Sequence, residues 1–239
     1  MDWNILFFVV FPYLSLAACV SVTIYRAVYR PFTISSLSSQ LLERKKLFWG
    51  NISFHWGINL VLLGHLGALL LPKGLTLWNG EPLRLYLLEA TGLALGIWAT
   101  AGMVILLYRR LTEARVKVVT TPMDLIVLGL LLLSGVTGLL TATVYRFGSY
   151  WFTGVFTPYL LGLLTLQPNT ALVAPLPWII KLHVINFFVM LAVFPFSRLV
   201  HIVAFPLEYL TRPWQVVIAN RQADRLSANQ PSANPIHKP

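Results

Sequence analysis

Cysteine is nearly absent from this chain, which has one, Cys19, among its 239 residues. A single cysteine excludes an internal disulfide and an iron–sulfur cluster held by several cysteines of this chain. It also leaves no C-x-x-C-H motif, so a covalently attached c-type haem is excluded. Cys19 lies in an apolar stretch, which favours a packing role over a chemical one.

Charge is also scarce. Only 11% of the residues are charged, 57% are hydrophobic, and the mean hydropathy is +0.72. Soluble domains carry about 25% charged residues, so the composition predicts an integral membrane protein. Acidic residues are fewer than basic ones: 8 Asp and Glu against 18 Lys and Arg give a net charge of +10. Basic residues collect on cytoplasmic loops of membrane proteins, so this excess does not require a nucleic-acid partner.

Long apolar runs account for most of the chain. About 20 apolar residues span a bilayer as a helix, and five segments qualify: Ile5–Tyr25, Phe48–Leu71, Leu83–Leu107, Met123–Val144 and Trp178–Phe205. The first lacks the basic start of a signal peptide, which predicts an uncleaved first span. A sixth patch, Tyr150–Pro168, is interrupted by Pro158 and predicts an interfacial or re-entrant segment. The fold class is therefore all-α, an integral membrane bundle of five helices.

The basic residues predict the orientation of this bundle. Of the 18 Lys and Arg, 14 lie in the loops after the first and third spans or on the C-terminal side. The positive-inside rule places the N-terminus outside and the C-terminus in the cytoplasm of a prokaryotic cell, in agreement with an odd number of spans. We expect residues 1–211 to form the membrane domain. Residues 212–239 form a polar cytoplasmic tail, flexible or ordered by a partner.

Four of the five histidines lie in two of the predicted spans. His55 and His65 belong to "FHWGINLVLLGHLGALLLP", and His183 and His201 to "KLHVINFFVMLAVFPFSRLVH". His237, in the tail, receives no role. Because the two spans run in opposite directions, His55 can face His201 near one surface and His65 can face His183 near the other. Ten residues of helix rise about 15 Å and eighteen about 27 Å, a mismatch of about 12 Å that tilt or a kink at Pro195 must absorb.

Facing imidazoles in a membrane are suited to haem. Two neutral imidazoles on opposite faces of a porphyrin complete a low-spin iron centre. Gly57, Gly64 and Gly67 beside the ligands leave room for the macrocycle. A single intramembrane histidine is often only hydrogen-bonded to a neighbour, but two pairs at matching depths make that alternative weaker. A zinc site fits less well, because it needs four ligands together and these histidines lie in two layers. A proton relay also fits less well, because it usually adds membrane carboxylates, which are nearly absent here.

The sequence also resembles a known family through several motifs: "SSQLLERK" before the second span, the two histidines ten apart, "RRL" after the third, "TTPMDLIVL" opening the fourth, and "FPFSRLVHIVAFPLEYLTRPWQ". From Phe7 to Val217 the chain is similar to the gamma subunit of respiratory nitrate reductase, its cytochrome b. The resemblance implies two b haems as cofactors, a proximal one on His55 and His201 and a distal one on His65 and His183. It also implies quinol oxidation beside the distal haem, near Gly64 and Arg84. A membrane-surface anchor remains the alternative role for Arg84.

The predicted function follows from this resemblance. The chain is expected to oxidise membrane quinol, release protons outside, and pass electrons through both haems to a cytoplasmic iron–sulfur subunit. Nitrate reduction would then occur in a separate molybdenum subunit. One alternative is a related dihaem subunit of another terminal reductase, of the sulfite or heterodisulfide type. The other is a haem-free membrane anchor or transporter.

Overall fold

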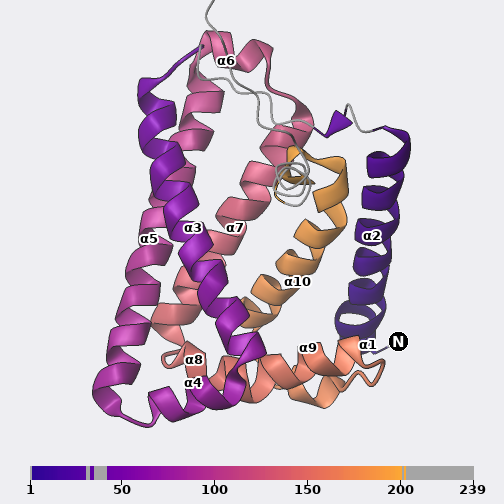
Figure 1. The fold of residues 1–239 in the computed structure, drawn as a ribbon, viewed down its shortest axis with the longest axis vertical. Helices are drawn as coiled ribbons and strands as arrows, with labels where there is room; N and C mark the ends of the chain where they lie inside the picture. The colour runs from indigo at the N-terminus through magenta and orange to yellow at the C-terminus, as the bar shows by residue number, and fades with distance from the viewer. Residues whose placement is uncertain (1, 31–32, 35–41, 201, 203–239) are drawn as a thin grey trace, which may run out of the picture. The chain divides into compact units, whose positions relative to one another are not determined.

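The computed structural model describes residues 2–30, 33–34, 42–200 and 202, and within them the long apolar segments are helices (Figure 1). The elements in chain order are α1 (Trp3–Ile5), the π-turn η1 (Leu6–Val10), α2 (Phe11–Tyr29), α3 (Lys45–Leu70), α4 (Pro72–Asn79), α5 (Pro82–Thr112), α6 (Ala114–Val118), α7 (Pro122–Val144), α8 (Gly148–Trp151), the π-turn η3 (Phe152–Phe156), α9 (Thr157–Leu164), the 3₁₀ turn η4 (Thr170–Leu172), α10 (Trp178–Val193) and the 3₁₀ turns η5 (Phe194–Phe196) and η6 (Arg198–Val200).

Five helices in the described part of the chain are long and apolar enough to cross a membrane. They are α1–η1–α2 taken together, α3, α5, α7 and the α10–η5 segment, which confirms the predicted five-helix bundle. The first residues of three helices explain where they begin. Pro72, Pro82 and Pro122 occupy first-turn positions of α4, α5 and α7, where the missing N–H costs nothing. Thr121 and Asp124 add a capping box to α7.

The fifth span differs from its prediction. The α-helix ends at Val193, a 3₁₀ turn follows, and Ser197 is extended with φ −104° and ψ 178°. The predicted span Trp178–Phe205 is therefore not one continuous helix, because Pro195, where the sequence predicts a kink, cannot donate a helical hydrogen bond. The break also removes the assumption of one straight 18-residue rise between His183 and His201. His201 itself lies outside the described residues. The estimated difference between the His55–His65 and His183–His201 rises therefore no longer applies, because it assumed an unbroken helix.

Charged side chains hold this break in place. The Arg26 guanidinium of α2 donates to the carbonyl oxygens of Pro195 and Ser197, and the Ser197 contact measures 3.2 Å. The Asp124 carboxylate accepts from Arg110 and Arg198, at 3.3 Å each. Carbonyls freed where a membrane helix is interrupted need a donor, and Arg26 supplies it from a neighbouring span.

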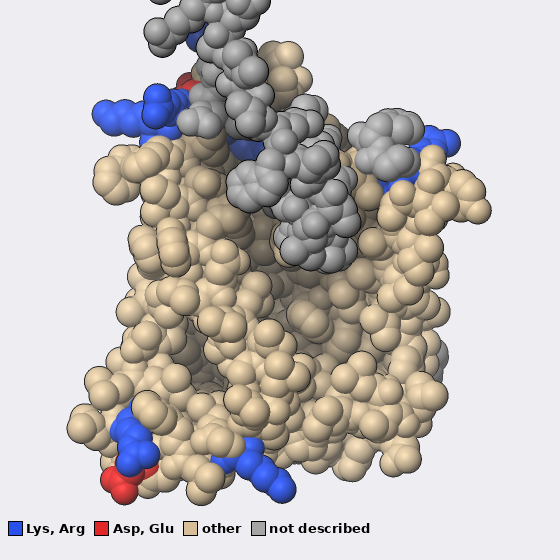
Figure 2. Space-filling view, viewed as in Figure 1, with Lys and Arg blue, Asp and Glu red and all other residues tan. Residues whose placement is uncertain are grey.

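The two ends of the bundle differ in charge. In Figure 1 the N-terminus lies at the end that carries α4, α8 and α9, and α6 lies at the opposite end. The described basic residues at the α6 end are Arg26, Arg30, Arg44, Lys45, Lys46, Arg109, Arg110, Arg115, Lys117 and Arg198. The other end has Lys73, Arg84, Arg146 and Lys181. Figure 2 shows Lys and Arg at both ends of one face and none across its middle, as a membrane-spanning surface requires. That the α6 end faces the cytoplasm stays a prediction.

Glycines bring α3 and α5 into close contact. A Cβ added to Gly57 would lie 2.8 Å from the Ala99 nitrogen, and one added to Gly102 would lie 2.5 Å from the Phe54 nitrogen. Gly50 sits against Leu106 in the same way, at 2.9 Å. Membrane helices gain no hydrophobic free energy by leaving lipid, so close backbone approach through small residues is a main source of packing energy.

Residues 148–164 form α8, η3 and α9. They cover most of the patch Tyr150–Pro168, which the sequence predicts to be interfacial or re-entrant, and they are not among the five candidate spans. In Figure 1 α9 runs across one end of the bundle, roughly perpendicular to the spans. Two prolines explain how it is attached. Pro12 and Pro72 have no N–H, so the carbonyls four residues earlier, at Phe8 and Ala68, lack their helical donors. The Tyr159 hydroxyl donates to the first at 2.8 Å, and the Thr157 hydroxyl to the second at 3.3 Å.

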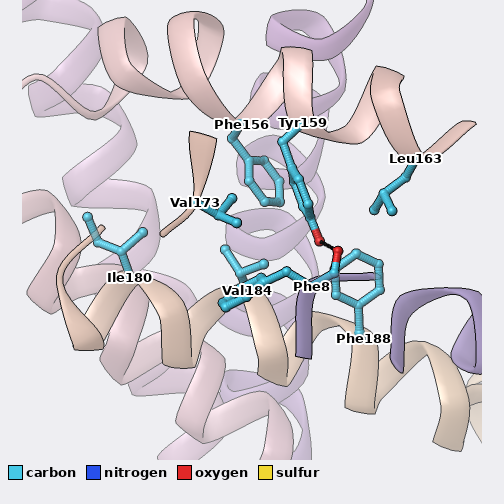
Figure 3. Packing of buried hydrophobic residues seen from close by; sticks show 8 residues of the cluster. All are labelled: Phe8, Phe156, Tyr159, Leu163, Val173, Ile180, Val184 and Phe188. Carbon is cyan, nitrogen blue, oxygen red and sulfur yellow. Dashed lines mark hydrogen bonds between the residues drawn. The ribbon is translucent and has the colours of Figure 1, made fainter. Parts of the chain in front are cut away.

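The buried core of this end lies under α9. Figure 3 shows Tyr159 reaching the Phe8 carbonyl among the side chains of the cluster, which comprises Phe8, Phe156, Tyr159, Leu163, Val173, Ile180, Val184 and Phe188. Tyr159 is fully buried, and burial raises the pKa of its phenol, so the hydroxyl stays protonated and donates. Because Ile180 and Val184 belong to this cluster, it fixes the stretch of α10 that carries His183.

Candidate functional site

The two histidines of α3 are held alike. The His55 Nδ1 lies 2.9 Å from the Asn51 carbonyl oxygen, and the His65 Nδ1 lies 2.8 Å from that of Val61. A carbonyl can only accept, so each Nδ1 carries a hydrogen and each Nε2 keeps its lone pair. Both imidazole side chains are exposed on the surface of α3. This is the tautomer and the outward presentation that a metal-ligating histidine needs.

Space for a ligand is present beside both rings. A hollow of about 200 Å³ is lined by His55, Trp56, Asn59, Leu60 and Leu63. A Cβ added to Gly64 or Gly67 would meet no atom within 4 Å, so these glycines leave open space on either side of His65. Gly57, by contrast, packs against α5. The prediction that the glycines make room for a macrocycle is wrong for Gly57, and for Gly64 and Gly67 it stays a prediction.

His183 is held differently, by a neighbouring helix. Its side chain is half-buried, and its Nδ1 lies 2.8 Å from the Thr137 hydroxyl of α7. A Cβ on Gly138 would lie 3.3 Å from the His183 Cε1, so a larger residue there would push the ring by a few tenths of an ångström. His65 of α3 is the partner that the antiparallel arrangement of the spans predicts for His183, and this pairing stays a prediction. The His65 ring in turn meets Phe152 edge to face, with centroids 5.2 Å apart.

The spans that carry the described imidazoles do not pack against each other. In the part of the chain that the structure describes, α3 packs along α5, and α10 packs against α7 and α2, but α3 and α10 are not a packed pair. The facing side chains of α3 and α10 are therefore not fixed by close packing of these two helices. A flat apolar group between the two helices, ligated from both sides, fits this arrangement and the apolar lining of the hollow at His55.

Arg84 lies near the start of α5, at the end of the bundle that carries α4. Its guanidinium sits over the Trp78 ring, 5.6 Å from the centroid, a cation–π distance. Trp78 belongs to α4, which directly follows the helix of His65. This contact is compatible with the surface-anchor alternative and with a place beside the predicted quinol site. His201, the fourth predicted ligand, lies outside the described residues.

The sequence does not reveal the partners of two polar residues. One is Thr137, although the polar spacing of Ser134, Thr137 and Thr141 along α7 is a recognisable stripe on one helix face. The other is Glu89 of α5, whose carboxylate accepts from the Ser149 backbone N–H at 2.9 Å and from its hydroxyl at 2.7 Å. Glu89 therefore caps the first turn of α8, an arrangement set by residues 60 apart in the chain.

These observations define a multi-pass helical membrane protein with ligand-ready imidazoles on two spans that leave room between them. Comparison with known proteins gives the family. The model for the nitrate reductase gamma subunit matches residues 4–220, most of this chain. The chain belongs to the nitrate reductase gamma subunit family.

Individual relatives agree. The nitrate reductase gamma chain of Bacillus subtilis (strain 168) is 35% identical over 211 residues, 87% of this chain and 94% of the relative. The respiratory nitrate reductase 1 gamma chain of Escherichia coli (strain K12) is 32% identical over 222 residues, 90% of this chain and 97% of the relative. The nitrate reductase-like protein NarX of Mycobacterium tuberculosis (strain H37Rv) is 32% identical over 95% of this chain, which corresponds to 35% of the relative.

Proposed function

We propose that this chain is the quinol-oxidising cytochrome b subunit that anchors a nitrate reductase and carries two b-type haems. The observation that carries the proposal is the presentation of the imidazoles on spans that are not packed together. On α3, His55 and His65 donate from Nδ1 to their own helix and expose Nε2. Backbone acceptors behind a ligating imidazole orient the ring and increase its basicity, so α3 is preorganised for ligation.

The ligand pairs follow from the antiparallel spans. His65 with His183 would hold the distal haem, at the end of the bundle that carries α4 and α9. His55 with His201 would hold the proximal haem, at the α6 end. When bound, the two haems supply one-electron transfer from one side of the bilayer to the other. The protein contributes the ring orientation, the apolar walls, and the open space at Gly64 and Gly67.

Quinol would bind at the distal end, near Gly64, His65 and Arg84. The open space at Gly64 admits a flat ring next to His65. Arg84, stacked on Trp78, supplies a fixed positive charge that would stabilise negative charge on the quinol oxygen as its proton leaves. Oxidation releases two electrons into the chain and two protons to the outer side. Each charge that crosses the bilayer is worth about 2.3 kcal/mol per 100 mV of membrane potential.

The partners would meet the α6 end. Electrons leave there for a cytoplasmic iron–sulfur subunit, which delivers them to the molybdenum subunit where nitrate is reduced. The proposal rests on the concentration of Lys and Arg at this end and on their ion pairs. Lys46 pairs with Glu113 at 2.6 Å and Arg109 with Glu43 at 2.8 Å, which links the loops before α3 and after α5 into one surface.

The haem content of His65→Ala tests this proposal. The wild-type chain in detergent should contain two b haems per polypeptide, measured as the pyridine haemochrome, and quinol should reduce both in the anaerobic protein. His65→Ala should retain one haem and lose reduction by quinol, because one of the two distal ligands is gone. His237→Ala, in the tail, is the matched control and should behave as the wild type. Retention of both haems with normal quinol reduction in His65→Ala would overturn the ligand assignment.

A further inference from the structure

The described imidazoles differ in what holds them. His55 and His65 bond carbonyls of their own helix, which no side-chain substitution removes. His183 is instead held by another helix, α7: its Nδ1 lies 2.8 Å from the Thr137 hydroxyl, and the Ser134 backbone of the preceding turn is a second contact of the ring. Thr137 is itself buried, with 3% of its surface exposed, so water does not compete for this bond. The orientation of the α10 ligand is therefore open to adjustment by a single residue.

The direction of the bond follows from the other contact of Thr137. Its hydroxyl lies 2.7 Å from the Leu133 carbonyl of the preceding turn, and a carbonyl can only accept. The single hydroxyl hydrogen is used there, so the Thr137 oxygen accepts the hydrogen bond from the His183 Nδ1–H. The Nε2 lone pair of His183 stays free, as on α3.

The surroundings restrict the ring to this position. Gly138, the next residue of α7, lies under the His183 Cε1. One turn along α10, the Asn186 side chain is buried and donates to the Leu130 carbonyl at 3.0 Å and to the Ser134 hydroxyl. Leu130, Ser134 and Thr137 are spaced three to four residues apart and share one face of α7. The two helices are thus registered by polar contacts at His183 and one turn further along α10.

We propose that Thr137 is a positioning residue for His183 and that it sets the redox potential of the haem this histidine ligates. The inference rests on the proposed function. An acceptor on Nδ1–H makes the imidazole a stronger electron donor through Nε2, which stabilises the oxidised iron and lowers the midpoint potential. The effect is confined to one haem, because the α3 ligands have acceptors of their own. Thr137 thereby fixes part of the driving force between the two haems.

The test is a potentiometric titration of both haems in the purified protein. Thr137→Val removes the acceptor while keeping the shape, and it should raise the midpoint potential of one haem and leave the other unchanged. Thr137→Ser keeps the hydroxyl and should restore the wild-type value. Thr141→Val is the matched control. It removes a buried hydroxyl one turn further along α7 for which the described residues provide no hydrogen-bond partner, and both potentials should stay at the wild-type values.

Three results would overturn the inference: wild-type potentials in Thr137→Val, an equal shift in Thr137→Ser, or an equal shift in Thr141→Val. If Thr137→Val loses a haem, the comparison becomes haem content. Retention by Thr137→Ser then supports the role of the hydroxyl, and equal loss refutes it. A wild-type chain without two b haems would instead refute the proposed function. Normal haem content with no response at Thr137 would refute only this inference.

Discussion

Gly102→Ala tests whether the contact between α3 and α5 holds His55 in place. The added methyl group would lie 2.5 Å from the Phe54 nitrogen and 2.8 Å from the Gly50 carbonyl oxygen. Both are backbone atoms, so no side chain can turn away to relieve the overlap. A normal contact of 3.4 Å instead of 2.5 Å requires the two backbones to separate by roughly 0.9 Å. Overpacking of this kind costs about 1–3 kcal/mol of folding stability.

The displaced residue Phe54 directly precedes His55, so the shift should reach the proximal ligand. We expect Gly102→Ala to lower the thermal unfolding temperature and to reduce occupancy of the proximal haem more than that of the distal one, measured by redox titration of the absorbance bands. The matched control is Gly92→Ala in the same helix, where the new Cβ meets no atom within 4 Å. Replacing a helical glycine there should be neutral or stabilising by up to ~1 kcal/mol. Equal stability and haem content in Gly102→Ala and Gly92→Ala would refute the reasoning.

Two further substitutions probe the ends of the bundle. Tyr159→Phe leaves the Phe8 carbonyl without a donor and should cost about 1–2 kcal/mol, seen as a lower unfolding temperature; an unchanged temperature would show that another group satisfies this carbonyl. Glu43→Gln tests the ion pair with Arg109, which is 2% exposed. Burial of Glu43 opposes its ionisation, but backbone N–H donors and Arg109 outweigh it, and the pKa of Glu43 is lowered. A lowered folded-state pKa gives stability that is present above the unfolded pKa and lost as the pH falls through the folded one. The stability difference between wild type and Glu43→Gln should therefore be largest at neutral pH and vanish in acid; a difference independent of pH would contradict this role.

Much of the fold was predictable because the bilayer constrains it. A span requires a long apolar run, and prolines and a capping box mark several helix starts, so four of the five spans agree with prediction to within a few residues at most ends. The fifth was predicted as one run because hydropathy does not register backbone hydrogen bonds. The run continues past Pro195, but the α-helix ends at Val193. Pro195 was noted as a kink, and the extended backbone at Ser197 makes it an end.

For the candidate site too, the sequence predicted some features and the structure was needed for others. The presence of His55, His65 and His183 in apolar spans pointed to the helices that carry the proposed ligands, because histidine is rare in such spans. The sequence did not reveal how each ring is held. The acceptors on α3 are backbone atoms, which every sequence has, and the acceptor for His183 comes from Thr137, 46 residues earlier in the chain. Nor did hydropathy separate Gly64, which faces open space, from Gly57, which packs against α5.

The sequence by itself determined the number of spans, the charge asymmetry of the two ends and the histidines available as ligands, because each depends on composition along one segment in contact with lipid or water. Only the tertiary structure decided how the segment 148–164 is attached. Its hydroxyls at Thr157 and Tyr159 satisfy carbonyls that Pro72 and Pro12 leave without donors. Only the structure showed that α3 and α10 are not closely packed against each other among the described residues. Both features depend on contacts between segments that are far apart in the chain. In a bilayer, a backbone group left without a hydrogen-bond partner costs several kcal/mol, so these contacts matter for stability.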